Sequence, residues 1–328
     1  MTKKLKEDKN KLVEIVSLKK IFVILTLPLL FNLAYASEEK TDDRLLEETV
    51  ALSKEVKEFG KTLGIDRSPA LTKSVLNAVP LSSITIYIKS VYFISKPYVA
   101  WIYFTKPCAA LGIKSMSGYT KEYSVYFRCV DEYADSSAII TPDFAKSSLE
   151  RRVEVFLHED LHTNTEQLYG GDYSESLVTP LAMIAALEYF KNKGDETAKN
   201  KIADYIKGWR VISLELNSLV KEINELYSAE PHDDLLSQKA QNILANKYPN
   251  FYRRLAQILK NQYFATGFNA AISGEFMYYK DFDRVISLYE KAGNAKALIE
   301  DIKNAPAGKE DLEKYLEELD QKYSKPAQ

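Results

Sequence analysis

The segment His158–His162 reads HEDLH and therefore contains the pattern H-E-x-x-H. It uses two of the three histidines in the 328 residues of the chain. On an α-helix, positions four apart lie on the same face, one turn from each other. Two imidazoles so placed can bind one zinc ion, and Glu159 beside them can act as a general base on an attacking water. The pattern predicts a zinc site; the competing interpretation is a surface helix with scattered polar residues.

The residues around the motif carry the signals of a helix. Ser147 or Ser148 can cap its start, and Glu150 follows where an acidic group suits the helix dipole. Apolar residues then recur at helical spacing: Leu149, Val153, Phe156, Leu157, Leu161 and Leu168. Gly170-Gly171 predicts the end of this helix. A second helix is expected from a cap at Ser174, with a kink at Pro180 near its start.

A zinc hydrolase keeps three protein ligands and leaves one position open. Glu175, thirteen residues after His162, is the expected third ligand, because the Gly-Gly turn lets the second helix fold back toward the histidines. The alternative is that this carboxylate only favours the start of its helix. Asp172 is a weaker competitor. Two other glutamates are less suitable as the third ligand: Glu166 lies only one turn beyond the motif, and Glu188 lies far along the second helix.

Two blocks of the chain resemble the predicted zinc aminopeptidases of Gram-negative bacteria. The first block is HEDLH followed by Ser174-Glu175-Ser176, and the second is Gly267–Ala271 followed by Tyr278-Tyr279. The chain departs from the family pattern at Asp160-Leu161, where a small apolar pair is usual, and at Phe268. Asp160 is expected to serve as an acceptor behind the site or to be solvated.

The resemblance also implies roles and a fold. It implies that Tyr279, or its neighbour Tyr278, donates a hydrogen bond to the oxyanion; the alternative is a tyrosine that only packs. Asn269 can orient a ligand or bind substrate backbone, and the alternative is a role in a turn or a cap. The resemblance implies a zincin-like metallopeptidase: an α+β, predominantly helical fold with a small antiparallel sheet beside the HExxH helix.

The expected strands come from β-branched and aromatic segments after an opening helix. These are residues 84–88, 91–94, 98–104, 124–130 and 138–141. An alternative for residues 84–104 is an aromatic, lysine-bearing surface that rests on a membrane. Beyond residue 195 the pattern predicts helices, including residues 202–226, 235–245, 255–264 and 312–323. The domain prediction is a signal peptide over 1–36, a helix and β-rich part over 37–146, and a helical part with the zinc site over 147–328, the last two forming one catalytic domain.

The start of the chain predicts export. Lys19-Lys20 precede an apolar run, and Ala34-Tyr35-Ala36 matches an A-x-A cleavage pattern before Ser37. The run is short for a spanning helix. We therefore expect a periplasmic or secreted protein with no stable membrane span after cleavage, and a membrane-anchored one only if the signal is retained.

Composition excludes some partners and leaves others open. The net charge is −2, and no basic block with interleaved aromatics favours nucleic acid. In an exported chain Cys108 and Cys129 can form a disulfide; the alternative is two buried thiols. His232 is expected in a loop, exposed or capping.

These observations predict an exported zinc-dependent peptidase that acts on peptides or proteins through a metal-activated water, with aminopeptidase activity as the family label implies. The alternative is a non-catalytic exported protein, either a zinc binder or a helical envelope interaction protein.

Overall fold

The computed structural model describes residues 42–76, 82–90, 98–104, 123–130, 138–168, 174–229, 234–261, 263–265 and 268–325. The predicted signal segment, the Gly170-Gly171 turn, Asp172, Cys108 and His232 lie outside the described residues. The expected strand over 91–94 lies outside them as well.

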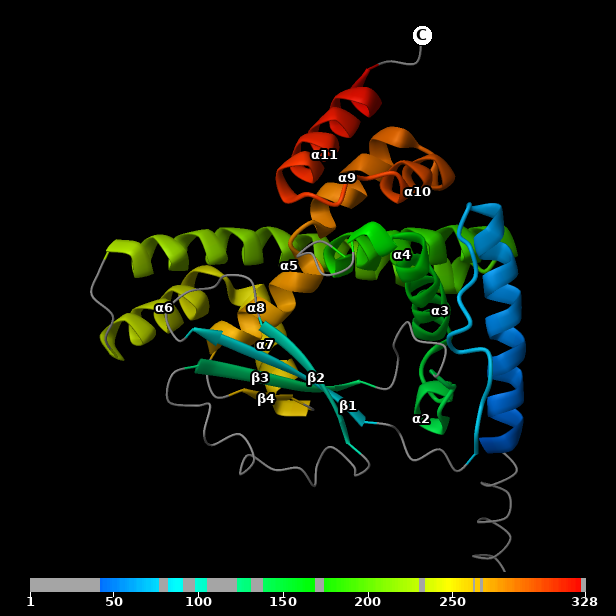
Figure 1. Cartoon of the computed structure of the whole chain (residues 1–328), viewed down its shortest axis with the longest axis horizontal. Coiled ribbons are helices and arrows are strands. Elements are labelled where there is room, and N and C mark those ends of the chain that lie inside the picture. The colour runs from blue at the N-terminus through cyan, green and yellow to red at the C-terminus, as the bar shows by residue number, and fades with distance from the viewer. Residues whose placement is uncertain are drawn as a thin grey trace, which may run out of the picture.

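Helices form most of the described chain (Figure 1). An N-terminal helix covers residues 42–62. It is followed by α2 (Pro142–Ala145), α3 (Leu149–Asn164), the 3-10 turn η3 (Glu166–Leu168), α4 (Ser174–Lys193), α5 (Glu196–Ala229), α6 (Asp234–Lys247), α7 (Pro249–Asn261), α8 (Phe268–Tyr279), α9 (Phe282–Ala292), α10 (Ala295–Lys303) and α11 (Lys309–Ser324).

The two helices with the candidate ligands are built from local signals. Ser148 caps α3, because its hydroxyl accepts a hydrogen bond from the backbone N–H of Arg151. Glu150 stands in the first turn of α3, where its negative charge suits the helix dipole. The second helix begins at Ser174, as expected, and runs through Pro180 to Lys193.

Two clusters of buried apolar residues hold the helices together. The first joins the N-terminal helix, α3, α4 and α9 to α11, with Val56, Phe156 and Leu181 among its fully buried members. The second cluster joins the four helices α5, α6, α7 and α8 around Tyr227 and Phe251. Because residues before and after position 146 share the first cluster, the N-terminal helix is part of the same core as the candidate site.

Four antiparallel strands lie in the order β2-β1-β3-β4. Their bounds are β1 (Ser82–Ser90), β2 (Tyr98–Phe104), β3 (Tyr123–Val130) and β4 (Tyr263–Ala265). The main neighbours of these strands outside the sheet are α8 and α7. In Figure 1 they lie on the far side of α3 from the blue N-terminal helix.

The chain is predominantly helical, as expected, but the zincin-like fold expected from the resemblance, with a sheet beside the HExxH helix, is wrong. The described chain is overwhelmingly helical, and no sheet flanks the HExxH helix in the zincin-like manner. The partners of α3 are instead α4, α5 and the N-terminal helix. The physical reason is that α3 has buried residues around most of its circumference, so helices occupy the place expected for a sheet.

Two element boundaries also differ from expectation. Residues 138–141 form only an isolated parallel bridge between Ser74 and Ile140. Thr141 accepts from the backbone N–H of Phe144, and Pro142 follows at the first helical position, so the chain starts α2 there. The expected helix over 255–264 ends at Asn261, and Phe264 lies in β4.

Within the residues that the structure describes, no helix has the length and apolar character needed to cross a membrane.

Candidate metal centre

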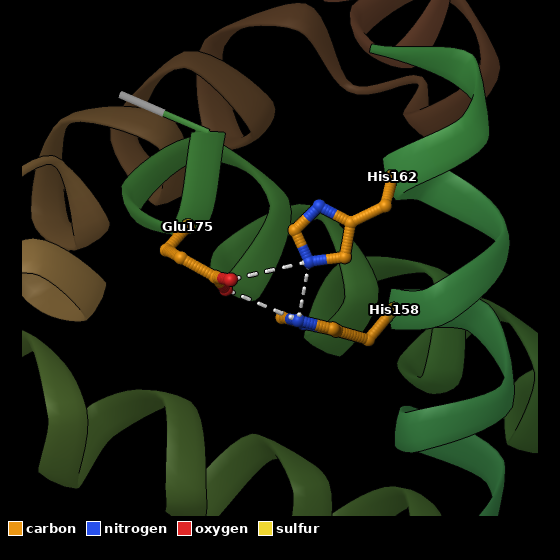
Figure 2. A group of neighbouring side chains, drawn as sticks. All are labelled: His158, His162 and Glu175. Carbon is orange, nitrogen blue, oxygen red and sulfur yellow. Dashed lines mark hydrogen bonds and ion pairs between the residues drawn. The ribbon is translucent and has the colours of Figure 1, made fainter. Parts of the chain in front are cut away.

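His158, His162 and Glu175 converge from two helices (Figure 2). The histidines project from successive turns of α3, and the carboxylate comes from the first turn of α4. Nε2 of His158 lies 3.0 Å from Nε2 of His162. Oε2 of Glu175 lies 3.3 Å from Nε2 of His158, and Oε1 of Glu175 lies 3.4 Å from Nε2 of His162. The sequence prediction that these three side chains meet is thus matched by their placement.

The spacing of the three donor atoms suits zinc. Zinc bonds of about 2.1 Å to nitrogen and oxygen, at tetrahedral angles, separate two ligand atoms by roughly 3.4 Å. The two Nε2 atoms, and each Nε2 with the carboxylate oxygen of Glu175 nearest to it, are separated by this distance or slightly less. One ligand atom from each of the three residues lies within 4.8 Å of the other two. Among the described residues this is the one group of three His, Cys, Asp or Glu side chains whose ligand atoms lie within 4.8 Å of one another. Two imidazoles and one carboxylate leave the fourth corner of a tetrahedron for water or substrate.

The electrostatics show how strongly these groups interact without a metal. Burial by itself would lower the pKa of His158, but the hydrogen-bonded carboxylate of Glu175 and the charges of Glu159 and Glu154 raise it to about 9. Burial by itself would raise the pKa of Glu175, but His162 and His158 lower it well below its usual value. The site therefore holds a carboxylate beside a cationic imidazole. A divalent cation would take over the role of that proton.

The outer nitrogens of the two imidazoles differ in their surroundings. Nδ1 of His162 lies 3.3 Å from the hydroxyl oxygen of Ser174, the residue before the glutamate ligand. If Nε2 binds a metal, Nδ1 carries the proton and donates to this hydroxyl, which fixes the orientation of the ring. Nδ1 of His158 is buried and has no hydrogen-bond partner among the residues that the structure describes.

Glu159, the expected general base, is a buried carboxylate within the metal-binding turn of α3, with 5% of its surface exposed. It is close enough to His158 to raise the pKa of that imidazole by its charge. Because it is buried next to His158 and is not one of the converging donor groups, this carboxylate is the candidate proton acceptor.

The competing carboxylates are placed elsewhere. Glu166 is exposed in η3. Glu188 accepts a hydrogen bond of 2.5 Å from the hydroxyl of Tyr289 and faces Lys191. Asp160 is 1% exposed, so the expectation that it is solvated is wrong; it accepts from Lys57 and Ser68.

The residues of the second block contribute to packing contacts. The ring of Tyr279 stacks on Trp209 with 4.0 Å between centroids, and it also contacts Tyr278 and Phe282. Asn269 is buried in the first turn of α8, where its side-chain oxygen accepts from the hydroxyl of Tyr227 at 3.1 Å. Tyr279 and Asn269 therefore both have packing or hydrogen-bond partners within the protein. The oxyanion role of Tyr279 stays a prediction.

Sequence reasoning missed two polar contacts that hold the ligand helices. It assigned Ser174 only to helix capping, whereas the hydroxyl reaches His162. It also did not anticipate that Ser176, on the other side of Glu175, donates a 2.5 Å hydrogen bond to the buried Asp281. The Ser-Glu-Ser sequence was the available signal, since each hydroxyl borders the ligand. The partners of the two hydroxyls, His162 and Asp281, lie 12 and 105 residues away along the chain, and the Ser-Glu-Ser sequence does not reveal them.

No family model matches the chain, and neither does any curated protein or solved structure.

Proposed function

We propose that this protein is a zinc-dependent peptidase whose ligands are His158, His162 and Glu175. The convergence of two imidazole nitrogens and one carboxylate group, with contacts of 3.0, 3.3 and 3.4 Å between neighbouring donor atoms, is the observation that carries the proposal. The buried carboxylate of Glu159 next to them adds the group that a hydrolase needs and a simple zinc binder does not.

Each residue of the proposed site has a separate role in hydrolysis. Zinc in this ligand set would supply a Lewis acid that acidifies water and polarises a substrate carbonyl. Glu159 accepts the proton of the attacking water and then donates it to the leaving amine. Ser174 holds the ring of His162, and the carboxylate of Glu175, as the third ligand, offsets part of the charge of the zinc. The substrate class is a peptide or protein, with aminopeptidase action the form suggested by the resemblance of the two sequence blocks.

The decisive experiment compares Glu159→Gln with Glu150→Gln. Both glutamates are buried on α3, but Glu150 pairs with Lys201 at 2.9 Å and lies two turns before the motif. Glutamine preserves the shape of Glu159 and removes its ability to accept a proton. We expect Glu159→Gln to keep zinc and fold while hydrolysis of a mixed peptide library falls roughly 10²–10⁴-fold. Glu150→Gln should remain active.

The outcomes separate the proposal from its alternatives. A Glu159→Gln variant as active as the wild type would overturn the mechanism. A wild-type chain that binds zinc stoichiometrically and cleaves nothing in the library would identify a non-catalytic zinc-binding protein. A chain without zinc would leave a helical interaction protein.

We propose further that the protein acts outside the cytosol, on the basis of the apolar run and the Ala34-Tyr35-Ala36 pattern. Expression of the full chain in a Gram-negative host, followed by N-terminal sequencing, tests this. The expected mature start is Ser37, and a soluble cytosolic product that retains Met1 would contradict it.

A further inference from the structure

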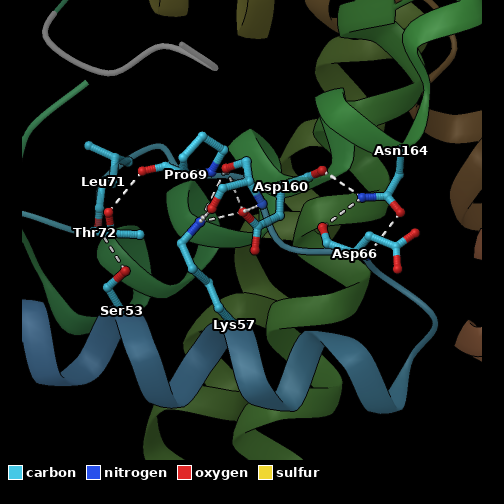
Figure 3. A network of polar contacts seen from close by, with 9 residues as sticks. Ser53, Lys57, Asp66, Pro69, Leu71, Thr72, Asp160 and Asn164 are labelled. Atoms are coloured by element: carbon cyan, nitrogen blue, oxygen red, sulfur yellow. Dashed lines mark hydrogen bonds and ion pairs between the residues drawn. The ribbon is translucent and has the colours of Figure 1, made fainter. Parts of the chain in front are cut away.

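We infer that Lys57 and Asp160 form a positioning pair for the metal centre, which fixes the rotation of α3 so that His158 and His162 face Glu175. The inference rests on the proposed zinc site, although not on its catalytic activity. Figure 3 shows the pair: Lys57 reaches from the N-terminal helix to Asp160 on α3.

The position of Asp160 along the helix is the first argument. Successive residues of an α-helix are about 100° apart, so Asp160 lies roughly 200° around the axis from both His158 and His162. It therefore stands on the back of the same turn whose front carries the two imidazoles. A contact that holds Asp160 fixes the direction of both histidines at once.

One carboxylate oxygen of Asp160 accepts three hydrogen bonds. Its Oδ1 accepts from Nζ of Lys57, from the backbone N–H of Ser68 at 2.9 Å, and from the hydroxyl of Ser68 at 2.7 Å. Lys57 also donates to the backbone carbonyl and hydroxyl oxygens of Ser68. These bonds come from two segments, the N-terminal helix and the chain that follows it.

A second contact repeats the arrangement one turn later. Asn164 lies four residues after Asp160 and so on the same face of α3. Its side chain accepts from the backbone N–H of Asp66 at 2.9 Å and donates to the Asp66 carbonyl at 2.9 Å. The segment 66–68 therefore binds the back of α3 at two successive turns: at Asp160, which lies between the two histidines in sequence, and at Asn164, two residues after His162.

Energetics indicate orientation rather than stability as the role of the pair. Lys57 and Asp160 have side chains that are only 2% and 1% exposed. Burying two charges costs desolvation that their attraction barely offsets, and apolar pairs of similar size are often as stable. What an apolar pair lacks is direction, because the hydrogen bonds that Oδ1 of Asp160 accepts from fixed donors specify one rotation of the helix.

The test uses two paired replacements and one matched control. Lys57→Met with Asp160→Leu removes charge and direction. Lys57→Met with Asp160→Asn removes charge but keeps an oxygen that can accept from Ser68. Ser53→Ala is the control, because Ser53 is a buried residue of the same N-terminal helix whose hydroxyl bonds the carbonyl of Leu71 at 2.7 Å, away from α3. The measurements are zinc affinity by chelator competition, the visible spectrum of the cobalt-loaded protein, and urea unfolding without metal.

We expect the methionine–leucine variant to unfold near the wild-type urea midpoint but to bind zinc about 10-fold more weakly or worse, the effect typical of losing a group that orients ligands. Its cobalt spectrum should change, and the methionine–asparagine variant should recover most of the affinity. Ser53→Ala should keep both affinity and spectrum. If the apolar pair does not fold, Ser68→Ala replaces it and should weaken zinc binding several-fold.

Wild-type zinc affinity and an unchanged cobalt spectrum in a folded methionine–leucine or Ser68→Ala variant would overturn the inference. A zinc-loaded wild type that cleaves no peptide would overturn the proposed function alone, since the affinities would still report positioning. A wild type that binds no zinc would overturn both.

Discussion

The hydroxyl oxygen of Ser174 lies 3.3 Å from Nδ1 of His162, while the next residue along the chain, Glu175, approaches Nε2 of the same imidazole at 3.4 Å. The first turn of α4 thus contacts both nitrogens of one ring, the inner one through a candidate ligand and the outer one through a hydrogen-bonding group. With a metal on Nε2, Nδ1 would donate to this hydroxyl, so the orientation of the ring would be tied to the position of α4.

Removing the hydroxyl should weaken metal binding without removing a ligand. We expect Ser174→Ala to lower zinc affinity by about 10-fold, at the lower end of the range for groups that orient a ligand. Chelator competition measures the change. Ser213→Ala is a matched control, since Ser213 is a fully buried serine of α5 that donates to the backbone carbonyl of Tyr279 at 2.7 Å. Equal zinc affinities for the two variants would contradict the role of Ser174.

The ligand set itself is tested by single alanine replacements. His158→Ala or His162→Ala should abolish stoichiometric zinc binding, because two remaining ligands hold zinc poorly. Glu175→Ala should weaken it strongly. Glu166→Ala is the control, since this exposed glutamate one turn beyond His162 should have no effect. Elemental analysis of the purified proteins gives the answer, and full zinc content in Glu175→Ala would show that the third ligand lies elsewhere.

The three candidate ligands could be predicted from the sequence because the signals that place them are local. His158 and His162 are spaced by one helical turn, and the helix between Ser148 and Asn164 carries its own cap and apolar pattern. Glu175 required one further step, a turn between two helices, which the Gly-Gly pair suggested. A short spacing along the chain limited the positions that this carboxylate can reach.

The partners of α3 were not accessible in the same way. A buried lysine such as Lys57 looks in the sequence like one more polar residue of an amphipathic helix, and its partner Asp160 is 103 residues away. The sheet was likewise misplaced, because β-branched segments predict strands but do not say which helix covers them. Long-range pairing of helices depends on the whole packed surface and not on any one segment.

The oxyanion role of Tyr279 is tested by Tyr279→Phe, which preserves the ring that stacks on Trp209 and removes only the hydroxyl. If the hydroxyl stabilises the oxyanion, as the resemblance implies, kcat should fall roughly 10²–10³-fold with zinc affinity unchanged. Tyr278→Phe is the paired control on the neighbouring residue. A kcat within twofold of the wild type would assign Tyr279 to packing alone.

The pH dependence of metal binding follows from the raised pKa of His158. In the metal-free protein this imidazole titrates at about 9, above the value near 6.5 that it would have in the unfolded chain. Its protonated form therefore stabilises the metal-free fold fully below about pH 6.5, and that contribution is lost as the pH rises through about 9. Glu175 has the opposite sign: its lowered pKa stabilises the fold above about pH 4.5 and less as the pH falls below that value. The metal-free protein should thus be most stable between about pH 4.5 and 6.5, and it should lose on the order of 3 kcal/mol from His158 on going to pH 9 and above.

Zinc reverses this dependence, because it binds only the neutral imidazole. Below pH 9, each zinc ion bound should displace about one proton from His158, so affinity should rise about tenfold per pH unit and level off above pH 9. Calorimetry at pH 7 in two buffers with different ionisation enthalpies counts the protons released, and urea unfolding of the metal-free protein from pH 5 to 9.5 follows the stability. His158→Asn is the control, since it should flatten the alkaline loss of stability in the metal-free protein. Zinc binding that releases no proton at pH 7, together with a metal-free stability that does not fall toward pH 9, would show that Glu175 does not hold His158 in its charged form.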